Sequence, residues 1–345
     1  MISVAPVLDE GDIRVGARSG ASMSHRHCHF TIADYNSSDL TIDYTWENPL
    51  QPILGLVRTM RPRQWTKNIF IYAGVVFDGQ LFIPVSFLRV TAAFFLLCLI
   101  SGSVYIINDL VDLERDRQHP KKRSRPLPSG ELPIPIAAAA AVIIPLVTTA
   151  AALLLDNGLA VIIALYLIIN LFYSFRLKHI VIIDVLSITS GFVLRVAAGV
   201  AVISVQAFSP WLYACTALLA LFLAVGKRRQ ELIQMQEQAG AVREALNKYN
   251  LPLLDDMLRF VMVGTFMTYL LYTIERPSIL LAGNNLTLVT VPFVLYGLFR
   301  YLYLIHVEGE GSAPDEVLLK DRPLQITILL WGLSFVLILY VPNWM

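Results

Sequence analysis

The chain has 345 residues, of which 56% are hydrophobic and 15% are charged, and its mean hydropathy is +0.62. A soluble domain of this length carries about 25% charged residues, so the composition excludes a large soluble core and indicates a polytopic membrane protein. The net charge of +1 gives no reason to expect a nucleic-acid partner.

Residues 1–54 are polar and mixed in composition. They lack the apolar stretch behind a basic start that marks a secretory signal. We expect this segment to be a flexible tail on the cytoplasmic side, and residues 55–345 to form the membrane domain.

Nine hydrophobic runs follow, most of them close to the roughly 20 residues that a helix needs to cross a bilayer. None alternates with the period of two that a membrane strand would show. The first run is the weakest, because Asp78 and Gly79 interrupt it. The sequence therefore predicts an all-α bundle of nine transmembrane helices, near residues 67–82, 86–108, 132–154, 158–175, 181–203, 209–226, 257–274, 279–304 and 323–342.

Lys and Arg residues precede the first run and follow the second, fourth, sixth and eighth runs. Basic connections face the cytosol in membrane proteins, so this alternation places the N-terminus inside the cell and the C-terminus outside. The long connections 109–131 and 227–256 lie on the same side. We therefore expect an integral membrane protein, of the inner membrane in a bacterium, with its active site on the cytoplasmic face.

The stretch YIINDLVDLERDR, residues 105–117, ends the second run in a series of acids. On a continuous helix Asn108, Asp112 and Asp116 share one face, and Asp109 stands one step around it. Like charges four residues apart destabilise a helix, so a counter-charge is required. Ion pairs with the arginines of the same stretch are one source. Bound Mg²⁺, which prefers oxygen ligands and bridges carboxylates to phosphates, is the source that we favour, with Asn108, Asp109, Asp112 and Asp116 as ligands.

Basic and amide side chains flank these acids. The stretch RPRQWTKN offers Arg61, Lys67 and Asn68 before the first run, and HPKKRSRPLPSG offers Arg125 after the acids. Bases around carboxylates favour an anion held by metal and Lys or Arg together. The alternative is a topology signal in contact with lipid headgroups, which we favour for Lys121 and Lys122.

A second polar group surrounds the start of the fifth run. Tyr173 and Lys178 lie in the preceding connection, Asp184 opens the helix, and Arg195 follows on the same face about 16 Å deeper at 1.5 Å per residue. Ionisable residues within a span commonly face a bundle interior or a wet cavity, so we expect a cavity wall here. The alternative is a structural ion pair with another helix.

Two further polar stretches have structural interpretations. GKRRQEL, after the sixth run, is typical of a membrane anchor. Asp321 precedes Pro323 at the last run, which is the pattern of a helix N-cap.

The quoted motifs and the nine runs resemble the UbiA-type intramembrane prenyltransferase superfamily over about residues 55–342. Within it, RPRQWTKN, NDLVDLERDRQHPKKRSRPLPSG, LKHIVIIDV, GKRRQEL and PDEVLLKDRPL are similar to the decaprenyl-phosphate phosphoribosyltransferase branch. Aromatic prenyltransferases usually carry a second D-x-x-x-D motif. Here Ile188 stands four residues after Asp184, so a second metal cradle is in doubt.

This resemblance implies a bundle around a cavity that is open to the cytosol and laterally to lipid. It implies phosphoribosyl pyrophosphate as donor, a polyprenyl phosphate as acceptor and Mg²⁺ as cofactor; a homo-oligomer is left open. Transfer of a prenyl group to an aromatic or other acceptor is the nearest alternative. A transporter is disfavoured, because the charges lie at the helix ends and not at the midplane. The implied catalytic residues are Asp112, Asp116 and Asp184, and the implied substrate-binding residues are Arg61, Lys67, Asn68, Arg125, Tyr173, Lys178 and Arg195.

Overall fold

The computed structural model describes residues 50–204, 209–237, 248–280, 285–309, 317 and 320–341. These residues form helices and turns and no strand, which confirms the all-α prediction. The predicted tail lies almost entirely outside the described residues, and the first described helix begins at Gln51.

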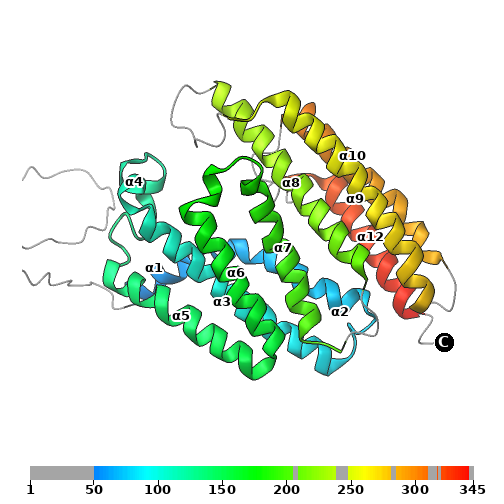
Figure 1. Cartoon of the computed structure of the whole chain (residues 1–345), viewed down its shortest axis with the longest axis horizontal. Coiled ribbons are helices and arrows are strands. Elements are labelled where there is room, and N and C mark those ends of the chain that lie inside the picture. Colours follow the sequence, from blue (N-terminus) through cyan, green and yellow to red (C-terminus); the bar gives the residue numbers. More distant parts are fainter. Residues whose placement is uncertain are drawn as a thin grey trace, which may run out of the picture. The chain divides into compact units, whose positions relative to one another are not determined.

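Eight long helices and several short ones make up the membrane domain (Figure 1). The long ones are α3 (Pro84–Val111), α5 (Ile134–Leu155), α6 (Asn157–Phe175), α7 (Ile183–Ala201), α8 (Pro210–Glu237), α9 (Leu251–Leu280), α10 (Val291–His306) and α12 (Arg322–Tyr340). The short ones are α1 (Gln51–Thr59), α2 (Ala73–Phe77) and α4 (Leu113–Gln118), with the 3-10 helices η1 (Pro62–Tyr72), η2 (Lys122–Ser124), η3 (Leu177–His179) and η5 (Leu286–Thr290).

Eight helical segments in the described part of the chain are long and apolar enough to cross a membrane. They coincide with the last eight predicted runs. Large apolar side chains remain exposed along them, for example Leu146, Val147 and Leu154 of α5. Such exposure suits a hydrocarbon solvent and not water. The chain is an integral membrane protein.

The first predicted run is neither a long α-helix nor a loop. It consists of η1 and α2, which end where Gly79 takes a positive φ of 73°. Arg61, before η1, contacts Asp109 near the end of α3, and Gln80, after α2, accepts a hydrogen bond from Ser86 near its start. The segment therefore runs the length of α3. A 3-10 helix rises about 2 Å per residue, so a short segment covers that distance. The count of nine crossings stays a prediction.

Several helix boundaries differ from the prediction, mainly around the sixth, seventh and eighth runs: α9 also extends to Leu280, and the next helical segment begins at Leu286 and not at residue 279. The sixth run was expected to end near residue 226, but α8 continues to Glu237, and α9 begins at Leu251 instead of residue 257. The connection 227–256 is thus partly helical. The helix continues because Arg228 and Gln230 are buried against neighbouring helices, which no local hydrophobicity measure detects. The predicted N-cap is confirmed, since the Asp321 carboxylate accepts a hydrogen bond from the backbone N–H of Leu324.

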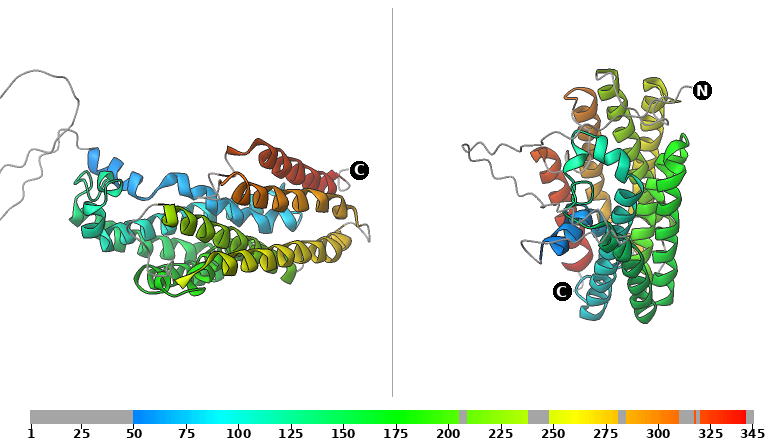
Figure 2. Two further views of the ribbon diagram at one scale, coloured as in Figure 1. Left: turned by 90° about the horizontal axis from the view of Figure 1, so that it is seen from above. Right: turned by 90° about the vertical axis from the view of Figure 1, so that its left-hand side faces the viewer.

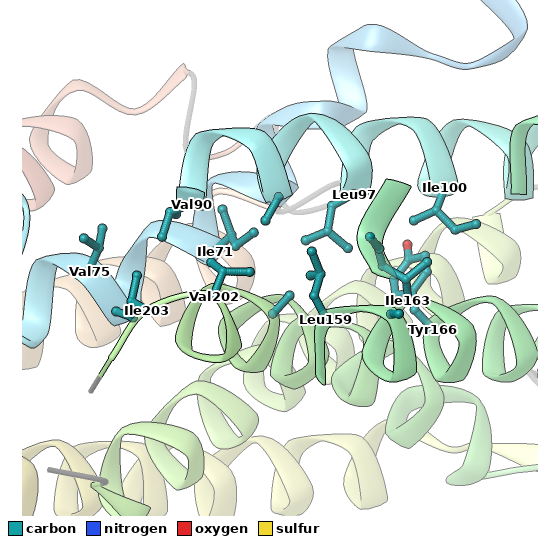
Figure 3. Packing of buried hydrophobic residues seen from close by; sticks show 14 of the residues in the cluster. Ile71, Val75, Val90, Leu97, Ile100, Leu159, Ile163, Tyr166, Val202 and Ile203 are labelled. Carbon is teal, nitrogen blue, oxygen red and sulfur yellow. The ribbon is translucent and has the colours of Figure 1, made fainter. Parts of the chain in front are cut away.

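The packing around η1 and α2 involves α3, α6 and α7. Figure 3 shows Ile71 next to Val202 and Val75 next to Ile203, in one apolar cluster that continues past Leu97 to Ile163. Gly199 of α7 makes the close approach feasible, because a Cβ there would stand 1.9 Å from the carbonyl oxygen of Ile71. A second apolar cluster joins α8, α9 and α10.

The long helices run roughly alongside one another and alternate in direction (Figures 1 and 2). As a result, the C-terminal end of α3, the turn between α6 and α7, the C-terminal end of α8 and the start of α9 lie toward one end of the bundle. Tyr340, at the far end of α12, hydrogen-bonds the α2 backbone at Val76 at the opposite end. The described acids and their ion-paired bases discussed below belong to the first end, whereas Arg195 lies deeper in the bundle.

Candidate functional site

Two of the predicted acids share one arginine. Asp109 and Asp116 are 2% and 0% exposed. Nη1 of Arg125 lies 2.6 Å from Oδ2 of Asp116 and 3.3 Å from Oδ1 of Asp109. Asp109 Oδ1 also accepts a hydrogen bond from Nη2 of Arg61 at 2.5 Å. The bridged pair is therefore Asp109 and Asp116, seven residues apart, which also fall on one helical face.

Asp112 has a different environment from these two acids. It breaks the helix, since its φ of −92° and ψ of 8° separate α3 from α4. The predicted continuous helix is thus interrupted, although the i to i+4 backbone hydrogen bonds on both sides of Asp112 persist. Its carboxylate is about one third exposed, with Lys178 Nζ at 3.7 Å and Arg115 Nη1 at 3.9 Å. Lys178 comes from η3, so this contact connects the acids with the turn between α6 and α7.

Arg61 is placed by the backbone. It follows α1 with φ of 53° and ψ of 65°, in the left-handed region that non-glycine residues seldom occupy. Its guanidinium lies 4.7 Å from the centre of the Tyr105 ring, a cation–π distance. The ion pair with Asp109 and the aromatic contact hold this side chain in place and offset the local backbone strain.

One carboxylate oxygen remains incompletely satisfied. Oδ1 of Asp116 is buried and has no hydrogen-bond partner among the described residues. Lys122 Nζ lies 3.3 Å away, close enough for an ion pair but without the geometry of a hydrogen bond. A buried charged acceptor left without a hydrogen bond is costly, so this atom is suited to a further ligand.

The acids were expected to bind Mg²⁺. Their oxygens are of the kind that Mg²⁺ takes, and Asn108 lies one turn before Asp112 on the half-buried side of α3. The described residues hold no group of three or more His, Cys, Asp or Glu side chains already disposed around one point. A metal bound by both Asp109 and Asp116 would have to displace the guanidinium of Arg125, which lies within 3.3 Å of both.

Asp184 is engaged by protein groups on both oxygens. Nε of Arg228 lies 2.7 Å from Oδ2, and the hydroxyl of Tyr249 donates to Oδ1 at 2.8 Å. Asp184 is 1% exposed and Arg228 is 2% exposed. The structural ion pair that the sequence left as an alternative is thus present, and its partner is Arg228 and not Arg195. The catalytic role of Asp184 stays a prediction.

The same group includes Tyr173 and Glu231. Arg228 donates to the Tyr173 hydroxyl at 3.4 Å and also pairs with Glu231 on its own helix. Tyr249 accepts a hydrogen bond at 2.7 Å from the backbone N–H of Ile182, which has a positive φ of 70°. Burial raises the pKa of Tyr249 to about 12, so its hydroxyl stays protonated and donates to Asp184.

Arg195 is buried among neutral acceptors. It donates to Asn68 Oδ1 at 2.8 Å, to the Gly191 carbonyl oxygen at 2.8 Å and to the Tyr166 hydroxyl at 2.9 Å. Its guanidinium also lies over the rings of Tyr166 and Phe192. Among the described residues it forms no ion pair with a carboxylate. Arg195 and Asn68, two predicted substrate-binding residues, therefore contact each other. Their hydrogen bonds connect η1 with α6 and α7.

The structure thus brings the predicted residues together in three groups. The first contains the acids and bases around Asp109, Asp112 and Asp116; the second contains Asp184 and Tyr173; the third contains Arg195 and Asn68. Lys67 lies in η1, next to Asn68, and is half-buried. The described apolar hollow of about 410 Å³, lined by Leu81, Phe82, Pro84 and Phe87, lies at the other end of α3. The predicted cytosolic cavity stays a prediction.

Arg228 and Tyr249 were not predicted as parts of a site. Arg228 belongs to a run of three bases that is typical of a topology signal, and its partner lies 44 residues away. The only local sign was the acid Glu231, three residues later on the same helix. Tyr249 has no charge, so composition does not single it out.

A bundle of membrane-spanning helices with a cluster of acids and bases at one end defines a polytopic membrane protein with a charged cluster at one end of its helices. Comparison with known proteins identifies the family. Residues 68–318 match the model of the UbiA prenyltransferase family. The chain belongs to this family, and it is an enzyme, a transferase.

Relatives with assigned activities agree with this membership. The chain is 32% identical to a decaprenyl-phosphate phosphoribosyltransferase of Corynebacterium glutamicum, over 83% of this chain and 87% of the relative. It is 32% identical to one from Mycolicibacterium smegmatis, over 82% and 92%. It is 30% identical to one from Mycobacterium tuberculosis, over 84% and 95%.

Solved structures support the fold. A structure of digeranylgeranylglyceryl phosphate synthase is similar with a TM-score of 0.61, at 18% identity over 83% of this chain and 98% of the other. A UbiA homologue from Archaeoglobus fulgidus, bound to GPP and Mg²⁺, is similar with a TM-score of 0.60, at 17% identity over 83% and 99%. This likeness confirms the UbiA-like bundle.

Proposed function

We propose that the enzyme transfers 5-phosphoribose from phosphoribosyl pyrophosphate to a polyprenyl phosphate, with release of pyrophosphate. The observation that carries this proposal is the mixed charge at the end of α3. Three carboxylates there meet five Lys and Arg side chains that come from four parts of the chain: Arg61, Arg115, Lys122 with Arg125, and Lys178. Both proposed substrates are rich in phosphate, which such bases bind.

The identity of the donor rests on the relatives. Three proteins at 30–32% identity, over more than four fifths of this chain, are decaprenyl-phosphate phosphoribosyltransferases. Three of the five stretches that carry the resemblance meet in the first group: RPRQWTKN, NDLVDLERDRQHPKKRSRPLPSG and LKHIVIIDV. The length of the polyprenyl chain is left open.

The proposed reaction needs little acid–base chemistry. An ionised oxygen of the lipid phosphate attacks the anomeric carbon of the ribose, and the bond from that carbon to the pyrophosphate oxygen breaks with its electron pair on the leaving group. No proton has to move. Arg61, Arg125 and Lys178 would hold the phosphates and stabilise the charge that develops on the leaving pyrophosphate.

Mg²⁺ belongs to this proposal as the cofactor. Asp112, Asp116 and Asp109, with Asn108, are the groups that would hold it, and it would neutralise the leaving pyrophosphate. Of these, Asp112 is the most accessible, since its cations stand at 3.7 Å and beyond.

We also propose that this site faces the cytosol. The described bases that surround the acids are those of the connections assigned to the inside by the positive-inside rule. Phosphoribosyl pyrophosphate is a charged, soluble molecule that does not cross a bilayer, so a cytosolic opening suits it. The acceptor would approach laterally, with its tail between helices and its phosphate at the boundary.

The rival function is prenyl transfer, and one observation favours it: the similar Archaeoglobus structure contains GPP and Mg²⁺. An assay with the purified protein decides between them. Radiolabelled phosphoribosyl pyrophosphate, a polyprenyl phosphate and Mg²⁺ should yield a labelled lipid, and EDTA should abolish it. No labelled lipid, with product formed from a prenyl diphosphate and an aromatic acceptor instead, would refute the proposal.

A further inference from the structure

The acids at the end of α3 are outnumbered by bases. Among the described ion pairs around them, three carboxylates face five cations, a formal net charge of +2. A free divalent cation approaching this cluster is therefore repelled by its net charge, whereas an anion is attracted.

The most suitable oxygens for a metal are also occupied. One nitrogen of Arg125 lies within 3.3 Å of both Asp109 and Asp116. A metal that used oxygens of this pair would have to displace that guanidinium. Displacement alone would leave a cation without its partners in a part-buried place, and stranding one member of such a pair is strongly unfavourable.

The displaced arginine needs a new partner, and a phosphate supplies one. Arg61, Lys122 and Arg125 are each about one third exposed, while the acids that they hold are 3% exposed or less. The cations therefore stand on the accessible side of the carboxylates. A diphosphate that arrives from that side meets the cations first, and a guanidinium binds phosphate oxygens in a bidentate manner as readily as it binds a carboxylate.

One carboxylate oxygen of the acids is available to a metal. Oδ1 of Asp116 is buried with no hydrogen-bond partner in the described part of the chain. Its nearest cation, Lys122, is held only at 3.3 Å. Because this oxygen is poorly satisfied by the protein, binding of a cation there recovers free energy that the protein contacts do not supply.

We infer that the site takes its divalent cation together with a diphosphate and not alone, and that Arg125 holds Asp109 and Asp116 in place of the metal until that complex arrives. Arg125 then exchanges its carboxylate partners for phosphate oxygens, and the freed carboxylates turn to the metal. The inference rests on the proposed function only in requiring a diphosphate ligand. It assigns Arg125 as a positioning residue that couples the two binding events.

The test uses calorimetry to measure three affinities of the full chain in detergent, each in a separate titration. Mn²⁺ is added alone, pyrophosphate is added with EDTA, and the preformed Mn²⁺–pyrophosphate complex is added last. We expect the complex to bind at least about tenfold more tightly than either component, which is within the usual range of coupling between ligands. Mn²⁺ alone that binds as tightly as the complex would overturn the inference.

The variant Arg125→Gln adds a second test, because it should change the affinities for Mn²⁺ alone and for pyrophosphate alone in opposite directions. Removal of this charge should strengthen the binding of Mn²⁺ alone several-fold, weaken that of pyrophosphate alone, and shrink the advantage of the complex. Arg123→Gln is the matched control. It removes the same charge from an exposed residue of the same loop that has no described ion pair, and it should change all three affinities alike and only slightly. Arg125→Gln behaving like Arg123→Gln would also refute the inference.

These measurements are independent of the transfer reaction. Pyrophosphate is common to phosphoribosyl and prenyl donors, so the coupling survives if the product assay favours prenyl transfer. Conversely, a labelled phosphoribosyl lipid together with tight binding of Mn²⁺ alone would retain the proposed function and reject the inference. The wild-type titrations decide the matter even if Arg125→Gln does not fold.

Discussion

Two regions of this molecule pair carboxylates with arginines, and the two pairings differ in how accessible the charges are. At the end of α3 each acid contacts two cations, and those that hold the buried pair are about one third exposed. At the start of α7 Asp184 has one cation, Arg228, which is 2% exposed, and a tyrosine fills its second oxygen. We call the first arrangement, Asp109, Asp112 and Asp116 with their bases, the open cluster, because a ligand is able to reach its charges. We call the second arrangement, Asp184 with Arg228, the closed pair, because both carboxylate oxygens of Asp184 already have protein partners. Residue type alone thus does not separate a part-exposed charged cluster from a buried, fully partnered ion pair.

The largest effect should come from breaking the closed pair. Arg228→Gln leaves Asp184 buried without its cation, which costs about 3–5 kcal/mol for a buried pair. We expect a marked loss of folded protein in detergent and a lower thermal midpoint. The double change Asp184→Leu with Arg228→Met removes both charges and should restore much of the loss. If Arg228→Gln leaves stability intact and abolishes metal–diphosphate binding instead, the two regions do not differ as described.

The next effect falls on activity and tests the open cluster. Asp112→Asn should reduce kcat/KM for phosphoribosyl transfer at least about 100-fold, since even partners beyond the metal ligands cost 10–100-fold when removed. Its thermal midpoint should stay near that of the wild type, because the Asp112 side chain is part-exposed and makes only loose ion pairs. Glu114→Gln, on the exposed side of α4 and paired with Arg117, is the control and should keep full activity. Intact transfer by Asp112→Asn would disprove the metal assignment.

Tyr249→Phe sharpens the comparison at the closed pair. It removes the hydroxyl that donates to Asp184 and accepts from the N–H of Ile182, so the expected loss of stability is about 1.5 kcal/mol. The wild type should also lose stability in alkali. Because burial raises the pKa of Tyr249 to about 12 in the folded protein, its contribution is complete below the ordinary tyrosine pKa near 10 and is lost as the pH rises through 12. Chemical denaturation at pH 8 and at pH 11 should show a smaller decrease in Tyr249→Phe than in the wild type.

The smallest effect should come from an exposed pair. Arg58 and Glu131 lie 2.7 Å apart, but the Arg58 side chain is 66% exposed. Exposed ion pairs contribute about 0–1 kcal/mol, so Arg58→Gln should leave the thermal midpoint and the transfer rate nearly unchanged. A large effect would mean that α1 takes part in the open cluster beyond its connection to Arg61.

Much of the candidate site was accessible from local patterns. The acids of residues 108–116 stand out because they follow an apolar run, and the bases of RPRQWTKN and of the loop after the acids are distinctive at that position. Their assembly at one end of the bundle follows from the alternation of the spans. The partners could not be assigned in this way. Arg125 and Arg61 converge on Asp109 from 16 residues after it and 48 residues before it, and helix periodicity carries no information at such separations.

The sequence by itself determined that this chain is a membrane-embedded helical bundle, where most of its spans lie, and which of its acids follow the end of an apolar run. Those features depend on hydrophobicity over about 20 residues and on charge in short connections, both of which are local quantities. Only the tertiary structure decided that Asp184 pairs with Arg228, that Arg195 rests on neutral groups, and that Asp109 and Asp116 share Arg125. These outcomes depend on which helix faces which, because a charge finds its partner across the bundle and not along the chain.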